Sequence, residues 1–239
     1  MKRIIYAVLL LLLISILLLF TSTYNCLPVK NDYILWEEAC MKEYLESEEL
    51  FIFIDLPKKT LYLFKNDEEM MKYRIAIGKK DTPTPVGLFR VISKGDWGEG
   101  FGGSWMGLNV PWGKYGIHGT TRPDSIGYAA SHGCIRMKST DAEKLYKVVR
   151  HGTAVEIYGG PFGPFGSGFR EIRPGDRGSD VMEVQKVLKL KGFYNGYVDG
   201  HYGLATERAL NSFQKANHLP ITNVITKNIY NKLGIILEE

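Results

Sequence analysis

The sequence predicts a multidomain protein with an N-terminal transmembrane helix, a mainly-β domain of sandwich or barrel-like form, and a small three-helix domain at the C-terminus. Three observations lead to this fold class. The chain starts with an apolar run, its middle holds short β-rich segments, and helical spacing of apolar residues follows a Gly/Pro-rich stretch. A chain of 239 residues is long enough for two domains. We therefore expect an anchor or signal segment, a spacer, the β domain, a linker and the helical domain at residues 1–24, 25–48, 49–158, 159–170 and 171–236.

The first segment is apolar from Ile4 to Phe20, behind the basic start Met1-Lys2-Arg3. A helix of this length is about 25 Å long, near the lower limit for crossing a bilayer. A secretory signal peptide begins in the same way, but this run is longer than a usual signal core and no clear cleavage site follows it. We expect an uncleaved anchor with its N-terminus in the cytoplasm and the remainder outside the membrane. Whether Cys26 and Cys40 pair there stays open.

The overall composition is that of an ordinary globular protein. Hydrophobic residues make up 45% and charged residues 23% of the chain, and the net charge is only +4. This balance gives no reason to expect a nucleic-acid partner.

The β domain is expected to open with a hairpin. Leu50–Asp55 and Thr60–Phe64 are rich in β-branched and aromatic residues, and they flank a turn at Pro57–Lys59. Further strands are expected at Lys72–Gly78 and Leu88–Ile92, where apolar residues continue the pattern.

The rest of this domain has one helical segment. Residues 82–87, TPTPVG, cannot be helical because two prolines fix φ and remove donors. Residues 141–151 place Ala142 and Leu145 on one face of a helix, and residues 153–158 return to a strand.

A glycine-rich stretch divides these elements. Residues 98–103 satisfy the pattern G-x-G-x-x-G, but no helix follows them, so a nucleotide-binding turn is excluded. We expect residues 95–107 to form a mobile loop at the rim of a cleft. Trp105 and Trp112 either line that cleft or lie in the core.

The C-terminal domain follows a linker, residues 159–168, which holds five glycines and two prolines. Helical spacing of apolar residues then predicts helices at about 179–191, 206–216 and 225–233. Three short helices in so small a domain are near the lower limit for independent folding.

The side chains that could take part in catalysis lie in residues 117–137, IHGTTRPDSIGYAASHGCIRM. Cys134 is a candidate nucleophile. His118 and His132 are candidate bases that would help it to form the reactive thiolate at a lower pH than an ordinary cysteine. If the backbone N–H groups of Gly133 and Cys134 aim at one point, they form an oxyanion hole. This constellation predicts acyl transfer.

Other interpretations of the same residues are weaker. A lone cysteine is usually a small buried hydrophobe, and a lone histidine is often structural. Zinc could be bound by His118, His132 and Cys134, but no H-E-x-x-H pattern is present. We expect neither a metal nor a cofactor.

At these residues the sequence resembles a known family. IHGT followed by SHGCIRM is similar to the signature of the L,D-transpeptidase catalytic domain, a cysteine acyltransferase of bacterial cell walls. The resemblance implies that Cys134 is the nucleophile and that His118 accepts and returns its proton. It also implies that the carbonyl group of Gly119 orients His118.

The neighbouring residues match the same signature. Ser131, His132 and Gly133 correspond to the characteristic run before the nucleophile, and we expect a positional role for His132. Arg136 stands where some members have asparagine. It either pairs with a substrate carboxylate or forms a structural ion pair.

A second resemblance covers the C-terminal domain. Residues 173–214 are similar to the peptidoglycan-binding domain of many cell-wall enzymes, and the matching residues include Gly178, Gln185, Leu188, Phe193, Asp199, Tyr202, Thr206, Ala209 and Gln214. The linker suggests that this domain binds peptidoglycan as an independent module.

Together the resemblances imply an L,D-transpeptidase that forms 3→3 peptidoglycan cross-links and releases D-Ala. An L,D-carboxypeptidase that uses water, or a wall-binding scaffold without activity, are the alternatives. The implied partners are peptidoglycan, the cytoplasmic membrane and carbapenem-type β-lactams as inhibitors. We expect a single-pass membrane protein with its catalytic domain extracellular and associated with the cell wall.

Overall fold

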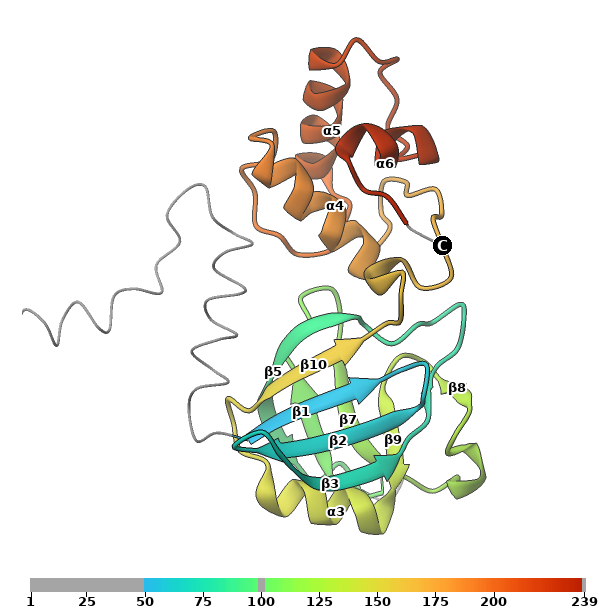
Figure 1. The fold of residues 1–239 in the computed structure, drawn as a ribbon, viewed down its shortest axis with the longest axis vertical. Helices are drawn as coiled ribbons and strands as arrows, with labels where there is room; N and C mark the ends of the chain where they lie inside the picture. Colours follow the sequence, from blue (N-terminus) through green and yellow to red (C-terminus); the bar gives the residue numbers. More distant parts are fainter. Residues whose placement is uncertain (1–49, 99–101, 238–239) are drawn as a thin grey trace, which may run out of the picture. The chain divides into compact units, whose positions relative to one another are not determined.

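The computed structural model describes residues 50–98 and 102–237 of the chain (Figure 1). The predicted anchor, the spacer and both of its cysteines lie outside these residues. No helix within the described ranges is both long enough and apolar enough to span a membrane.

The first domain is built on one eight-stranded sheet with the order β3-β2-β1-β10-β5-β6-β7-β9. The sheet curls so that β1, β2 and β3 lie in front of β7 and β9, which gives the barrel-like form expected from the sequence (Figure 1). A two-stranded sheet pairs β4 with β8. The strands are β1 Leu50–Asp55, β2 Thr60–Lys65, β3 Glu68–Arg74, β4 Ile77–Gly78, β5 Gly87–Gly95, β6 Trp105–Leu108, β7 Tyr115–Thr120, β8 Ala129–Ser131, β9 Ile135–Lys138 and β10 Ala154–Tyr158.

The predicted hairpin is confirmed. β1 and β2 pair antiparallel, with Ile52 opposite Leu63 and Ile54 opposite Leu61. These four side chains are fully buried, because alternate residues of a strand point to the same face. The hairpin therefore supplies one wall of the core.

The prediction of a strand at 72–78 was wrong in its bounds. β3 ends at Arg74, and β4 is a separate strand that pairs with β8. Between them, Ala76 exchanges two backbone hydrogen bonds with Arg136, of 2.8 and 2.9 Å. The chain leaves the β3 ladder here because Ile75 and Ala76 enter the core next to β9, and both are fully buried.

The predicted helix of this domain is present as α3, Ser139–Val148. Ala142 and Leu145 are its buried residues, as the spacing predicted, and the helix packs against β6, β7 and β9. α3 thus supports the strands that carry the signature motif.

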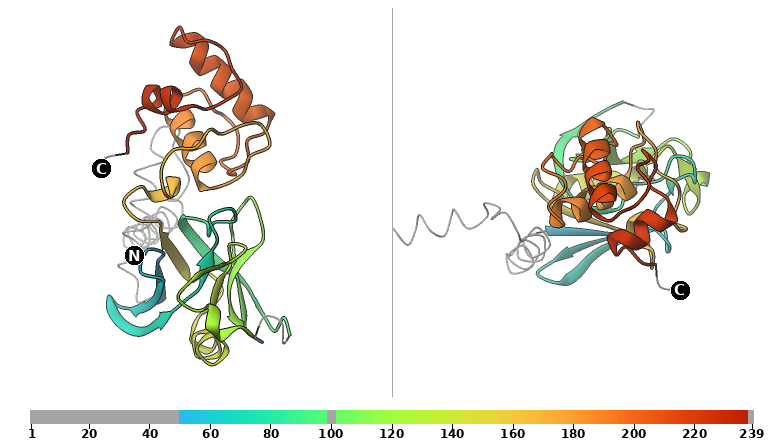
Figure 2. Two further views of the ribbon diagram at one scale, coloured as in Figure 1. Left: turned by 90° about the vertical axis from the view of Figure 1, so that its right-hand side faces the viewer. Right: turned by 90° about the horizontal axis from the view of Figure 1, so that it is seen from above.

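Three helices form the C-terminal domain: α4 Ser179–Leu190, α5 Leu204–Ala216 and α6 Lys227–Leu233 (Figure 2). Their apolar faces surround a separate core that includes Tyr202, Phe213 and Tyr230. Gln185 is fully buried in α4, and its side-chain oxygen accepts hydrogen bonds from the N–H groups of Asp199 (3.0 Å) and Gly200 (2.8 Å). Gln185 therefore fixes the loop between α4 and α5.

The second half of the predicted linker packs on this domain. The ring of Phe169 stacks on that of Tyr230 with centroids 4.2 Å apart, and Phe165 meets the same ring edge-on at 5.6 Å. The hydroxyl group of Tyr230 donates a hydrogen bond of 3.0 Å to the carbonyl oxygen of Arg170. The chain is therefore attached to the helical domain from Phe165 onward.

Candidate active site

Two parallel strands bring the signature residues together. β7 pairs with β9 so that His118 lies opposite Arg136, and Cys134 immediately precedes β9. The backbone N–H of Gly116 favours the ionised form of Cys134 and so acts to lower the pKa of this thiol. Continued by one residue, the β7–β9 register places Cys134 beside Gly116, two residues along from the His118–Arg136 pair, so Cys134 and His118 fall on the same face of the two strands. The thiol and the imidazole are therefore carried by neighbouring strands on one face of the sheet.

The imidazole of His118 is held in one tautomer. Its side chain is only 4% exposed, and Nδ1 lies 2.6 Å from the carbonyl oxygen of Gly119. A carbonyl oxygen can only accept, so Nδ1 carries the hydrogen in this contact. In the neutral ring Nε2 is then the acceptor, which is the state that a general base requires.

The thiol of Cys134 does not ionise more readily than an ordinary cysteine. It is a free, partly buried cysteine, and burial raises its pKa above the ordinary value. The N–H of Gly116 and the charge of Arg136 oppose this shift, because both favour the thiolate. Our expectation of early ionisation is therefore corrected: desolvation outweighs the two stabilising groups. A base must remove the proton at neutral pH.

The turn before the nucleophile is closed by Ser131. Its hydroxyl group donates a hydrogen bond of 2.6 Å to the carbonyl oxygen of Cys134 and accepts one of 3.0 Å from the N–H of Gly133. This N–H, which we expected in an oxyanion hole, is therefore used within the turn. Gly133 has φ of 109°, and a Cβ atom there would lie 2.6 Å from the ring of Tyr115. Only glycine fits.

The proline-rich segment braces this turn from outside. The hydroxyl group of Thr82 donates a hydrogen bond of 3.1 Å to the carbonyl oxygen of Ser131. That of Thr84 accepts one of 2.8 Å from the N–H of Gly78. The two threonines of TPTPVG therefore tie the segment to the turn and to β4.

The hydroxyl group of Ser131 can be tested by substitution. In Ser131→Ala, two buried backbone groups lose their partner, at a cost of about 1–3 kcal/mol each. We expect a lower melting temperature and slower alkylation of Cys134 by iodoacetamide, both measured on the purified protein. Ser131→Thr keeps the hydroxyl group and is the matched control. Unchanged alkylation in Ser131→Ala would show that the turn keeps its shape without these bonds.

The structure separates the other candidate residues. His132 is exposed, whereas Arg136 is half-buried and its guanidinium donates a hydrogen bond of 3.4 Å to the carbonyl oxygen of Ala130. In residues 50–98 and 102–237, no three His, Cys, Asp or Glu side chains are placed to hold a metal ion. The N–H of Gly119 donates to the carbonyl oxygen of Ser104 at 3.3 Å, so Gly119 serves the site through its own carbonyl.

Both tryptophans prove to be buried, and Trp105 also belongs to the site. Trp105 is the first residue of β6, whereas we expected it within a loop. It pairs with His118 of β7. The indole and imidazole ring centroids are 5.6 Å apart. Trp112 packs edge-on against Phe89 in the core. The pattern gave no indication of the contact between Trp105 and His118, because it depends on strand register.

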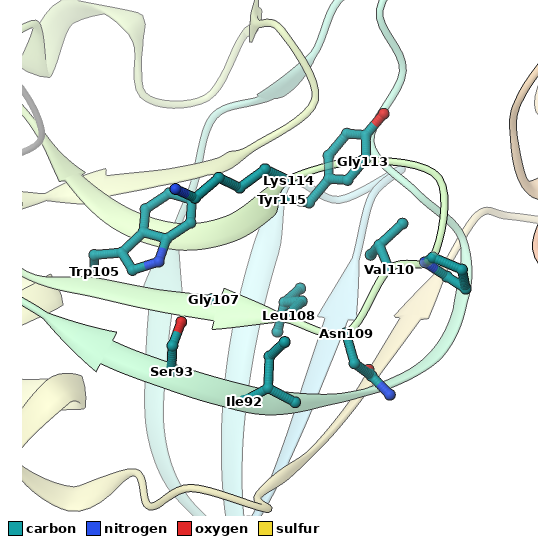
Figure 3. A pocket seen from close by; sticks show the side chains of 11 residues that line it. Ile92, Ser93, Trp105, Gly107, Leu108, Asn109, Val110, Gly113, Lys114 and Tyr115 are labelled. Carbon is teal, nitrogen blue, oxygen red and sulfur yellow. The ribbon is translucent and has the colours of Figure 1, made fainter.

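A pocket of about 470 Å³ lies beside Trp105. Figure 3 shows Ile92 and Ser93 of β5 along one edge and Trp105, Lys114 and Tyr115 along the other. Its lining is mainly apolar with one cation. Such a pocket suits a chain that carries both methylene groups and a charged end.

Comparisons with known proteins assign both domains. Residues 49–157 match the YkuD family model, described as the L,D-transpeptidase catalytic domain, and residues 177–233 match the model described as "Putative peptidoglycan binding domain". "Putative L,D-transpeptidase YkuD" of Bacillus subtilis (strain 168) is 44% identical over 107 residues, which cover 44% of this chain and 64% of that protein. The "Spore cortex-lytic enzyme" of Bacillus cereus is 48% identical over 50 residues, covering 21% of this chain and 19% of that protein.

Among solved structures, the catalytic domain of an Enterococcus faecium L,D-transpeptidase is 27% identical, with a TM-score of 0.41, covering 47% of this chain and 99% of that one. The match to the curated relatives above spans less than two thirds of their length. The two family matches nevertheless fall on the β domain and the helical domain in order. Residues 49–157 therefore match the L,D-transpeptidase catalytic-domain family, and residues 177–233 match the family of putative peptidoglycan-binding domains.

Proposed function

We propose that this protein is a peptidoglycan L,D-transpeptidase that forms 3→3 cross-links through an acyl-enzyme on Cys134. The observation that carries the proposal is the β7–β9 register, which puts Cys134 and His118 on neighbouring strands and on one face of the sheet. The imidazole is fixed by Gly119 in the tautomer that accepts a proton at Nε2.

The first half-reaction transfers the donor stem to the enzyme. Nε2 of His118 takes the thiol proton as the sulfur of Cys134 attacks the carbonyl carbon that precedes the terminal D-Ala. The C–N bond then breaks, and His118 passes its proton to the departing amine. A thioester on Cys134 and free D-Ala are the products. The proximity of Arg136 favours the sulfur anion during the attack.

The second half-reaction consumes the thioester. An amine of a neighbouring stem attacks the carbonyl carbon, His118 accepts the amine proton, and the C–S bond breaks as the proton returns to the sulfur. Water in place of the amine gives the L,D-carboxypeptidase reaction. The amine outcompetes water when it is held beside the thioester, because a bound acceptor gains several orders of magnitude in effective molarity over a free one. We propose that the pocket beside Trp105 holds this acceptor.

The C-terminal domain has the role of holding the polymer. We propose that it binds peptidoglycan, in keeping with the description of its family. We further propose that the apolar run between Ile4 and Phe20 anchors the chain in the cytoplasmic membrane, with both domains on the wall side.

The experiment is an incubation of the protein with purified disaccharide-tetrapeptide, followed by mass spectrometry. We expect 3→3 dimers together with released D-Ala. A carbapenem should block both products and should add its mass to the peptide that contains Cys134. If tripeptides and D-Ala form without dimers, the protein is an L,D-carboxypeptidase and the transpeptidase assignment is wrong. If neither product nor a carbapenem adduct forms, the remaining interpretation is a wall-binding scaffold without activity.

A further inference from the structure

A column of stacked groups stands behind the catalytic histidine. Trp97 stacks on Trp105 with ring centroids 4.1 Å apart and an interplanar angle of 8°. Trp105 in turn meets the ring of His118 at 5.6 Å and 30°. At the outer end, Nζ of Lys114 lies 3.8 Å from the centre of the Trp97 ring. Four groups from the β5–β6 loop and from around β6 and β7 are thus in series.

Glycines on two strands make room for this column. Gly107 and Gly116 pair across β6 and β7. A Cβ atom at Gly116 would lie 2.7 Å from the Trp105 ring, and one at Gly107 would lie 2.9 Å from its Nε1. The indole therefore rests on bare backbone, at the strand pair that also carries His118.

The column also has a fixed order of burial. Trp105 is 2% exposed and His118 is 4% exposed, whereas Trp97 is 37% exposed. Trp97 therefore covers the buried indole while its own outer face takes the ammonium group of Lys114. A cation over an aromatic face is attracted to it, so Lys114 holds Trp97 against Trp105.

We propose that Trp97, held by Lys114, is a positioning residue for His118 and acts through Trp105. The hydrogen bond to Gly119 fixes Nδ1 of the imidazole, and the ring of Trp105 limits the movement of the imidazole ring itself. Trp97 in turn covers Trp105. The column thereby helps to hold Nε2 where it can accept the proton of Cys134. This inference rests on the proposed function for the role of His118, but it can be tested without any peptidoglycan substrate.

The test measures alkylation of Cys134 by iodoacetamide from pH 6 to 10 in the full-length protein. We expect Trp97→Ala to slow alkylation about three- to tenfold near neutral pH, which corresponds to the interaction free energy of one aromatic pair. The rate at high pH should stay unchanged, since the thiolate there forms without a base. Trp97→Phe should restore most of the loss, and Lys114→Gln should give a smaller loss than Trp97→Ala. None of these changes touches Cys134 or Arg136.

Two controls separate positioning from stability. Tyr158→Ala removes a ring of similar exposure, 41%, that stacks on Phe53 at 6.2 Å. It should leave the profile unchanged. In a His118→Ala background, Trp97→Ala should have no further effect, because the residue that it positions is gone.

A Trp97→Ala protein with the wild-type pH profile overturns the proposal, whatever its melting temperature. An equal loss in the presence and in the absence of His118 also overturns it. Failure of the proposed function would appear instead as missing D-Ala and dimers, with the alkylation profile still responding to Trp97. The two failures are therefore distinguishable.

Discussion

Alanine in place of Cys134 is expected to abolish release of D-Ala and formation of dimers. Removal of a nucleophile that acts together with its base costs roughly 10⁴-fold or more in rate, because binding alone supplies little of the catalysis. The measurement is the yield of both products from tetrapeptide by mass spectrometry, over a time in which the wild type reaches completion.

This substitution should leave the fold intact. Cys134 is only partly buried, so its sulfur contributes little to the core. The melting temperature should therefore stay close to that of the wild type, and binding to insoluble peptidoglycan should persist through the C-terminal domain. If Cys134→Ala still releases D-Ala, another group is the nucleophile and the mechanism proposed above is wrong.

Replacement of His118 by alanine should have the next largest effect, and this effect should depend on pH. The pKa of Cys134 is raised by burial, so its thiol stays protonated to a higher pH than an ordinary cysteine. Near pH 7 the thiol is neutral, and without His118 no base removes its proton. We expect a loss of about 10²–10⁴-fold in the rate of acylation by a carbapenem at neutral pH.

The sign of the pH dependence follows from the same shift. As the pH rises through the elevated pKa of Cys134, the thiolate forms without help, and the His118→Ala variant should recover much of its acylation rate. Intact-protein mass spectrometry of the adduct between pH 6 and 10 measures this. His132→Ala is the control: its side chain is exposed, so it should keep the wild-type profile shape. A loss in His118→Ala that is equal at all pH values would show that His118 is not the base.

The elements that were predicted well are those with a clear period. Ile52 and Ile54 alternate with aromatic residues, and the pattern gave β1 with its correct bounds. In α4, Val181, Val184 and Leu188 follow helical spacing, and all three are buried. In such segments the apolar residues recur with the period of the strand or helix, so the buried face can be predicted from the sequence.

The strands around the site were missed for a physical reason. β6 and β7 contain Gly107, Gly116 and Gly119, which weaken any strand pattern because they carry no side chain. Here the glycines are needed for close packing: Gly107 and Gly116 lie under the ring of Trp105, and Gly119 lies against the backbone of Gly102. The features that make the site possible are those that conceal its strands.

The candidate site was predicted from its motif, but its supporting groups were not. Cys134, His118 and Ser131 lie in one short stretch whose pattern resembles a known family. Gly116 and Trp105 reach the same site through strand pairing, and register between strands cannot be derived from spacing along the chain. The pKa of Cys134 likewise depends on burial, which only the folded chain determines.

The attachment of Phe165 to the helical domain limits how far the enzyme can search. β10 ends at Tyr158, so residues 159–164 join the two domains, and the N–H of Gly163 already hydrogen-bonds the carbonyl oxygen of Gly160 at 2.9 Å within this segment. Fully extended, six residues span about 20 Å. Under the function proposed above, a connection this short would keep a glycan strand bound by the helical domain within a few nanometres of the thiol, at an effective concentration on the order of millimolar or above. Cys134 would then react with stem peptides close to the bound strand rather than with stems elsewhere in the wall.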